Sequence, residues 1–373
     1  MAGYFLYHSI GTFADKQAKL TATLTDFATH WAATDDAQWG YALTQQAAFL
    51  SKWAELIGAE PRHMAQAESV TGGLYSILRG LDPRRIQGGT VLIAKDCFPS
   101  LHFLLAETVT RMGGTLKTVE PAQGEAFVSD AQMLSAWDGD VRLAILTWVT
   151  STSSHKSDIK TLTEHGHKMG SLVGIDVTQG IGIRPYDVTD IGADFTVGSS
   201  LKWLCGVSGA AVIHATPELI ASCQPEFRGW FSQGNPFSWD LDAFEFAPDA
   251  RRFGNGTPNV LPAISCLSGL DFVLGTGVAN LAKDNAAKTA ILVDWVKDAG
   301  VTLVSPMEAD QRGGSVMISL PEAIDPTHVV NSLRGENLFT DARGQVLRLS
   351  PGNVTELEDC KHVISTLGKL LNM

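Results

Sequence analysis

The lysine at position 202 stands where a charged side chain is costly to bury. It lies in ADFTVGSSLKWLCG, residues 193–206, between an apolar run typical of a buried strand and the apolar residues 203–205. An amine that is buried without a partner either loses its charge or lowers stability by several kcal/mol. We therefore expect Lys202 to carry chemistry, and a neutral amine can form a Schiff base with an aldehyde.

The other candidate residues share one kind of position, because each follows a predicted strand or opens a predicted helix. Ligands of open α/β sheets bind at the carboxyl ends of the strands, and the first N–H groups of a helix favour phosphate. The residues at such positions are Asp176 and Gln179 after SLVGID, Phe98 after VLIAKD, and Ser69, Val70 and Thr71 at the start of SVTGGLYSILRGL.

Together these residue types match the needs of pyridoxal 5'-phosphate (PLP). This cofactor requires an amine for its aldehyde, a carboxylate beside its ring nitrogen and an anchor for its phosphate. Taken singly, a lysine beside an aromatic residue is more often structural, and an aspartate after a strand is usually a turn residue. The combination in this chain order is what predicts a PLP site.

The elements that must position these residues alternate between strand and helix. Helical periodicity occupies 98–114 and 158–170. Strands are predicted in VLIAKD, TLKTVE, VRLAILTWVT, SLVGIDVTQ, ADFTVGSS and GAAVIHA. Because most of these strands are apolar throughout, we expect a mostly parallel central sheet with helices on both faces, which is an α/β fold.

The two ends of the chain differ from this pattern. Residues 12–56 are largely helical in period, and a long helix is predicted from about Leu261. Strands follow in VTLVS, GSVMISL and VLRLSP, and a closing helix begins at Glu356. We expect residues 1–59 to be the N-terminal segment of a small α+β domain, residues 60–260 the large PLP-binding domain, and residues 261–373 the C-terminal part of the small domain.

The composition of the chain limits the kinds of partner that it can bind. The 373 residues carry a net charge of -12, which argues against a nucleic-acid or anionic-membrane surface and favours small ligands or proteins as partners. The N-terminus lacks a signal pattern and no run of eighteen apolar residues occurs, so we expect a cytoplasmic protein. The five cysteines are widely spaced and, like the histidines, show no metal-ligand spacing, so we expect neither disulfides nor a metal.

The order of the segments SVT, CFPS, DVTQ, SSLKWLCG, GWF, GNGTP and LRLSP resembles the class V aminotransferase superfamily of fold-type I PLP enzymes. It is most similar to kynureninases. YFLYHSIG (4–11), RGGSVMISL (312–320) and FTDARGQVLRLSP (339–351) extend the resemblance over nearly the whole chain. The resemblance implies the fold-type I architecture and a homodimer with active sites at the interface.

It also implies roles for individual residues. Lys202 would form the internal aldimine and shuttle protons, Asp176 would pair with the pyridine nitrogen, and Arg348 would bind the substrate carboxylate beside Ser9 and Tyr75. The implied cofactor-binding set is Val70, Thr71, Phe98, Asp176, Gln179, Ser199 or Ser200, Lys202, and Trp230 and Thr257, the last two reaching the phosphate of the neighbouring subunit.

Several positions depart from the kynureninase pattern. Gln179 stands where kynureninases carry His, Leu201 where they carry Tyr, His8 in place of Asn, and Tyr75 in place of a substrate-side His. Tyr75 and His8 suit a pocket or simple packing equally well. These departures affect the residues that would contact the substrate more than those that would hold the cofactor.

The reaction type therefore stays open among three classes. Hydrolytic Cβ–Cγ cleavage is the first, and transamination and a β-eliminating C–S lyase are the alternatives. A cysteine-dependent desulfurase is disfavoured because residues 339–353 contain no cysteine and Cys360 falls in the terminal helix. A regulator that binds PLP without turnover would not need Arg348.

Overall fold

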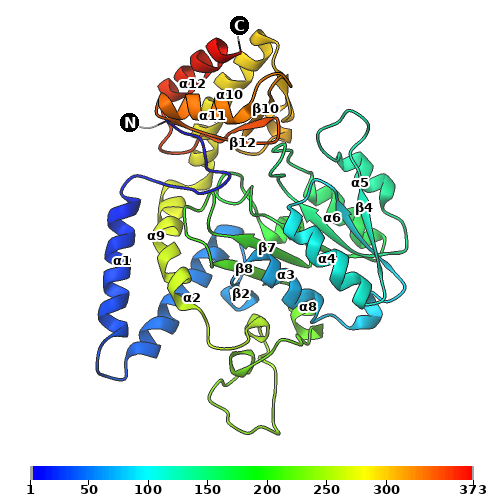
Figure 1. Cartoon of the computed structure of the whole chain (residues 1–373). Coiled ribbons are helices and arrows are strands. Elements are labelled where there is room, and N and C mark those ends of the chain that lie inside the picture. Colours follow the sequence, from blue (N-terminus) through cyan, green and yellow to red (C-terminus); the bar gives the residue numbers. More distant parts are fainter. Residues whose placement is uncertain (1–2, 372–373) are drawn as a thin grey trace.

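A seven-stranded sheet forms the centre of the computed structural model, which describes residues 3–371 (Figure 1). Its strand order is β2-β8-β7-β6-β5-β3-β4, and β8 alone runs antiparallel to its neighbours. The predicted mostly parallel sheet is confirmed. Its strands are β2 (Met64–Ala67), β3 (Thr90–Ala94), β4 (Thr115–Val119), β5 (Val141–Thr147), β6 (Leu172–Asp176), β7 (Phe195–Ser199) and β8 (Ala211–Ala215).

Helices cover both faces of this sheet because alternate strand residues point to opposite sides. In β5, Leu143 and Ile145 pack with α3 (Val70–Leu78) and α4 (Pro99–Arg111), whereas Ala144 and Leu146 lie in the core on the other face. That second core includes residues of α2 (Gln38–Ile57) and α6 (Ile159–Lys168). Shorter helices lie around them, namely α5 (Asp130–Ala136), α7 (Val188–Ile191) and α8 (Pro217–Ser222).

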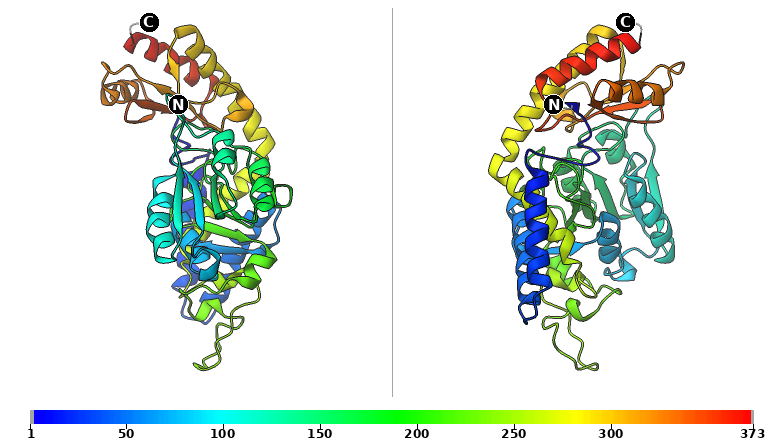
Figure 2. Two further views of the ribbon diagram at one scale, coloured as in Figure 1. Left: turned by 90° about the vertical axis from the view of Figure 1, so that its right-hand side faces the viewer. Right: turned by 60° about the vertical axis from the view of Figure 1, so that its left-hand side comes forward.

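A four-stranded antiparallel sheet, in the order β12-β13-β10-β9, forms the smaller α+β domain at one end of the molecule (Figure 2). Helices α10, α11 and α12 pack with it around one core. The bounds are β9 (Thr302–Leu303), β10 (Val316–Ser319), β12 (Asp341–Arg343), β13 (Val346–Leu349), α10 (Val278–Ala299), α11 (Pro326–Gly335) and α12 (Leu357–Leu370). The sequence patterns did not predict β2, β12 or α11.

The N-terminal segment is divided between the two domains. Strand β1 (Gly3–Tyr4) pairs in parallel with β11 (Leu338–Phe339) of the small domain. Helix α2, however, buries Phe49 and Trp53 in the core of the large sheet, and α1 (Lys16–Trp31) packs against α9 (Val260–Thr276). The apolar face of α2 therefore covers the large sheet, while the start of the chain pairs with the small one.

The helix predicted from about Leu261 is two helices. Helix α9 (Val260–Thr276) and α10 meet at Gly277, whose φ of 82° ends the first, and their axes differ by 82°. Among residues 3–371 no single helix has the length and hydropathy to cross a membrane, although this bent pair reaches both together. Much of α9 is buried in the protein core, including Leu270 and Val273.

Candidate active site

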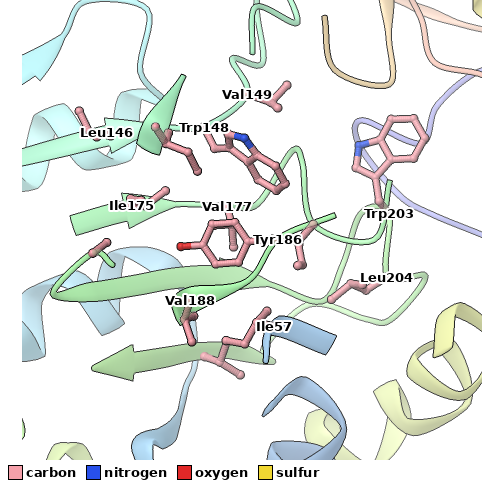
Figure 3. Close-up of a cluster of buried hydrophobic side chains, with 14 of the residues drawn as sticks. Ile57, Leu146, Trp148, Val149, Ile175, Val177, Tyr186, Val188, Trp203 and Leu204 are labelled. Atoms are coloured by element: carbon pink, nitrogen blue, oxygen red, sulfur yellow. The ribbon is translucent and has the colours of Figure 1, made fainter. Parts of the chain in front are cut away.

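Lys202 lies in the turn that follows β7. The turn is held by its buried neighbours Trp203 and Leu204, which belong to the core around β6 (Figure 3). The Lys202 carbonyl accepts a hydrogen bond from the Cys205 N–H at 2.8 Å, and Gly11 N–H donates to the Leu201 carbonyl at 3.1 Å. Burial lowers the pKa of Lys202 to about 8, an effect that the nearby Asp176 charge opposes. A substantial neutral fraction near pH 8 makes this amine nucleophilic.

Asp176 is the last residue of β6, the strand beside β7, and only 6 % of it is exposed. The Thr178 N–H donates to its Oδ1 at 3.0 Å. Burial raises the pKa of Asp176, while Thr178 and Lys202 act in the opposite direction. Within residues 3–371 no cationic side chain lies within ion-pair distance of this carboxylate. A buried acid without an ion-pair partner fits a protonated pyridine nitrogen, so the site suits PLP.

Phe98 brings an aromatic face to the same edge of the sheet. It is the N-cap residue of α4 after β3, and its side chain is 42 % exposed. The Lys202 Nζ lies 5.2 Å from the centre of its ring. The turn after β6 adds Gln179, whose Nε2 donates to the His8 carbonyl at 3.0 Å. The structure thus places Lys202 beside Phe98 and near Asp176.

The predicted phosphate anchors fall into two groups. Ser69 caps α3 by accepting from the Gly72 N–H at 3.1 Å, so Val70 and Thr71 supply first-turn amides that have no partner within the helix. Ser199 ends β7 and is partly exposed. Ser200 differs, because its hydroxyl is fully buried and accepts from Trp53 Nε1 at 3.0 Å.

Arg348 lies on β13 and is 5 % exposed. Its Nε donates to Asp341 Oδ1 at 2.9 Å, its Nη2 donates to Asp341 Oδ2, and its Nη1 donates to the Ser151 carbonyl at 3.3 Å. Nε2 of His8 lies 3.0 Å from Asp341 Oδ1. Burial alone would raise the pKa of Asp341, yet His8 and Arg348 hold that pKa below its usual value.

His8 joins elements from both domains. Its Nδ1 lies 2.7 Å from Ser350 Oγ, which in turn lies 2.6 Å from Ser315 Oγ. Its carbonyl accepts a hydrogen bond from Gln179 Nε2, and its ring faces Asp341. Burial lowers the pKa of His8, which Asp341 partly offsets. The N-terminal segment therefore lies between the Asp176 turn and the strand that carries Arg348.

The remaining predicted residues are Ser9, Tyr75, Trp230 and Thr257. Ser9 follows His8, is partly exposed and donates its N–H to the Leu6 carbonyl, and Tyr75 on α3 is 38 % exposed. Trp230 packs edge-to-face against Trp39 at 6.2 Å. Thr257 is exposed in the loop before α9. Within the described chain, no hydrogen bond or ion pair links Trp230 or Thr257 to Lys202, Asp176 or Arg348.

Three residues of this region were not singled out from the sequence. Ser151 follows strand β5, so the rule that located Asp176 would have found it. Thr178 lies in the quoted DVTQ segment, two residues after the acid it binds. Asp341 gave no signal of its own, because its importance comes from the pairing of β12 with β13.

Comparison with known proteins identifies related chains. The family model described as aminotransferase class V matches residues 18–347. A kynureninase of Bacillus cereus is 26% identical over 311 residues, 80% of this chain and 71% of the relative. An uncharacterized aminotransferase of Bacillus subtilis (strain 168) is 25% identical over 334 residues, 88% of this chain and 85% of the relative.

Solved structures share the fold. An apo cysteine desulfurase from Thermococcus onnurineus NA1 aligns with a TM-score of 0.87 at 16% identity, covering 100% of this chain and 95% of the other. The cystine C–S lyase C-DES with its product cysteine persulfide aligns with a TM-score of 0.85 at 17% identity, covering 100% and 98%. At these identities the likeness shows the architecture alone, and the predicted fold-type I architecture is confirmed.

Proposed function

The chain belongs to the class V aminotransferase family and is a PLP-dependent enzyme, and on that premise we propose that it hydrolyses the Cβ–Cγ bond of an amino acid bearing a γ-carbonyl group. This is the reaction of kynureninases. One arrangement supports the proposal: the Nζ of Lys202 lies 5.2 Å from the centre of the Phe98 ring, at the sheet edge where Asp176 ends the strand beside β7.

The cofactor contacts that we propose come from several parts of the chain. Asp176 would face the pyridine nitrogen, Phe98 would cover one ring face, and Gln179 would contact the ring hydroxyl. The phosphate would bind at the first turn of α3, where Val70 and Thr71 present their amides, together with Ser199. Ser200 is less suitable, because Trp53 already occupies its buried hydroxyl.

Bound PLP supplies an aldehyde that captures the substrate amine and a ring that accepts electrons from Cα. Lys202 removes the proton at Cα and returns protons later in the reaction. Asp176 keeps a proton on the ring nitrogen, because a carboxylate in a buried pocket raises its partner's pKa. Arg348 fixes the substrate carboxylate, and with it the bond that is to break.

The hydrolytic step uses one water molecule. Water adds to the γ-carbonyl carbon, the Cβ–Cγ bond breaks, and its electron pair stays with Cβ. The γ-carbon leaves as a carboxylic acid, and Cβ gains a proton from Lys202, so that alanine is the second product. Tyr75 and Ser9 would contact the part of the substrate beyond Cβ.

Transamination is the second candidate, and two observations favour it. Gln179 stands where kynureninases carry His, and the Bacillus subtilis relative is named an aminotransferase. A β-eliminating C–S lyase needs the same Lys202 and Arg348. A cysteine-dependent desulfurase is disfavoured, because all five cysteines are buried and burial raises the pKa of Cys360 to about 12.

We also propose a homodimer in which Trp230 and Thr257 reach the phosphate of the neighbouring subunit. In support, the loop between η3 (Trp230–Ser232) and η4 (Ala250–Phe253) exposes Trp239 at 83% and Leu241 at 95%. Exposed apolar side chains in one segment are typical of protein interfaces. Light scattering would report the mass, and Trp230→Ala should weaken PLP retention if the partner's phosphate is involved.

The proposed reaction is tested with the PLP-loaded protein and L-kynurenine or 3-hydroxykynurenine. Hydrolysis would release the corresponding anthranilate and alanine in equal amounts, measurable by fluorescence and mass. Amino transfer that requires an added 2-oxo acid, without anthranilate, would support the second candidate. A loaded protein that is inert toward every amino acid would support a regulator that binds PLP without turnover.

A further inference from the structure

Arg348 makes three hydrogen bonds that use only part of its guanidinium. An arginine side chain carries five N–H donors. Asp341 takes one from Nε and one from Nη2, and the Ser151 carbonyl takes one from Nη1. Each terminal nitrogen therefore keeps one N–H for a further acceptor. A carboxylate has two oxygens and can accept from both.

Both oxygens of the Asp341 carboxylate already have partners within the chain. Both oxygens accept from Arg348, and Oδ1 also lies 3.0 Å from His8 Nε2. The register of the small sheet places Asp341 directly opposite Arg348 on neighbouring strands. Residues that face each other in an antiparallel pair are held side by side by the backbone ladder. The pairing of the two side chains is therefore built into the sheet.

We infer that Asp341, supported by His8, is a positioning residue that fixes the guanidinium of Arg348 so that its two remaining N–H groups receive the α-carboxylate of the substrate. This inference rests on the proposed function, because it takes an α-amino acid as the substrate. Neither Asp341 nor His8 contacts the reacting atoms in this assignment. Their effect is exerted through the orientation of Arg348.

An opposite role for Asp341 would be competition, with its carboxylate occupying the place of the substrate's. The structure favours positioning for two reasons. The Arg348 side chain is 6% exposed, so loss of Asp341 would leave its charge buried without an ion-pair partner. The backbone pairing of β12 and β13 also keeps Asp341 opposite Arg348, and free donors remain for a second carboxylate.

The test compares two probes on the PLP-loaded enzyme: L-kynurenine, and kynuramine, which is the same molecule without the carboxylate. Binding is followed through the visible absorbance of the cofactor. For Asp341→Asn we expect L-kynurenine to bind about tenfold or more weakly and kynuramine to change less than about twofold, because only the carboxylate contact is lost. Asp341→Glu should recover part of the lost affinity for L-kynurenine. His8→Ala should weaken the binding of L-kynurenine by a smaller factor and leave the binding of kynuramine nearly unchanged.

Asp82→Asn is the matched control. Asp82 also pairs with an arginine, Arg84, but it lies beside Leu172 and Asp194 at the starts of β6 and β7, the opposite edge of the sheet. This control should leave both affinities unchanged. Thermal melts of all variants identify any that do not fold, and His8→Ala then carries the test because it leaves the ion pair of Arg348 in place.

The outcomes separate the two proposals. Tighter binding of L-kynurenine by Asp341→Asn would show competition and overturn the inference. Equal weakening of both probes would show a merely structural role, which overturns it as well. If wild-type enzyme bound the two probes equally, Arg348 would not bind the substrate carboxylate. That result would overturn the inference but leave the proposed reaction standing. Wild-type enzyme that binds neither would overturn the proposed reaction and the inference together.

Discussion

The amine of Lys202 lies 5.2 Å from the centre of the Phe98 ring, although the two residues follow strands that are separated by β6 and β5 in the sheet. Lys202 comes from the turn after β7, and Phe98 begins α4 after β3. Asp176, at the end of β6, lies along the same edge. We propose that PLP binds along this edge, where its ring would meet an aromatic face, a carboxylate and an amine.

Lys202→Ala should abolish both turnover and covalent attachment of PLP. Borohydride reduction of the loaded wild-type protein should label one peptide, the one that contains Lys202, and the variant should give no label. The matched control is Lys95→Ala, because Lys95 follows β3 at the same edge but is exposed and pairs with Glu120. A label on a different lysine in the wild-type protein would disprove the assignment.

The lowered pKa of Lys202 predicts how PLP uptake depends on pH. Only the neutral amine attacks an aldehyde, and the pKa of this amine is about 8 instead of 10.5. The rate of covalent capture by the cofactor-free protein should therefore rise about tenfold per pH unit below pH 8 and level off above it. Stopped-flow absorbance between pH 6.5 and 9.5 measures this, with a free lysine derivative as reference. A rate that keeps rising to pH 9.5, as for the reference, would show that burial does not depress the pKa.

Much of this arrangement was predictable from the sequence. Apolar strands in alternation with helices predicted the parallel sheet, and Lys202, Asp176 and Phe98 follow from collecting residues at strand ends. This works because parallel strands bring their carboxyl ends to one edge whatever the separation in sequence. The break between α9 and α10 could also have been predicted, because Gly275 and Gly277 interrupt the long apolar helix.

The environment of Arg348 was not predictable in the same way. The position of its partner Asp341 is fixed by the register of β12 against β13. His8, which contacts Asp341, lies more than 300 residues earlier in the chain. Sequence spacing carries no information about either contact. The contact of Ser200 with Trp53 is likewise a result of packing, and sequence spacing does not reveal it.

Asp176→Asn should stabilise the cofactor-free protein while it weakens catalysis. Burial raises the folded-state pKa of Asp176 above its unfolded value, so the folded protein loses stability as pH rises above the unfolded-state value, and this loss is present at pH 7. Asparagine keeps the acceptor for the Thr178 N–H but carries no charge, so we expect unfolding free energy at pH 7 to rise by about 1–2 kcal/mol. Turnover should fall by roughly 10² or more, because the ring nitrogen loses its counter-charge.

Denaturant unfolding with and without PLP measures both effects of Asp176→Asn. The control is Asp190→Asn, since Asp190 forms an exposed pair with Lys160 and should change stability little. A cofactor-free Asp176→Asn protein that is less stable than wild type at pH 7 would contradict the buried-charge argument. Unchanged turnover would contradict the role at the ring nitrogen.

Gly11→Ala should displace the turn that carries Lys202. A Cβ added at Gly11 would lie 1.8 Å from the Lys202 carbonyl oxygen and 3.1 Å from Cys205 Cα, and backbone atoms cannot rotate away as a side chain can. The N-terminal segment or the Lys202 turn must therefore move. We expect stability to fall by about 1–3 kcal/mol, as in other overpacked sites, and PLP affinity to fall with it.

A helical glycine in open space gives the contrast that isolates this effect. Gly40 lies in α2 with no atom within 4 Å of its added Cβ, so Gly40→Ala should raise stability by up to about 1 kcal/mol through helix propensity alone. Comparing both variants by denaturant unfolding and PLP titration separates the collision from the general effect of replacing glycine. If Gly11→Ala bound PLP as tightly as Gly40→Ala, the contact between the N-terminal segment and the Lys202 turn would have no part in holding the lysine in place. The fixed position of that turn keeps the Lys202 amine beside the Phe98 ring, so the titration tests the site through Gly11, which has no assigned contact with cofactor or substrate.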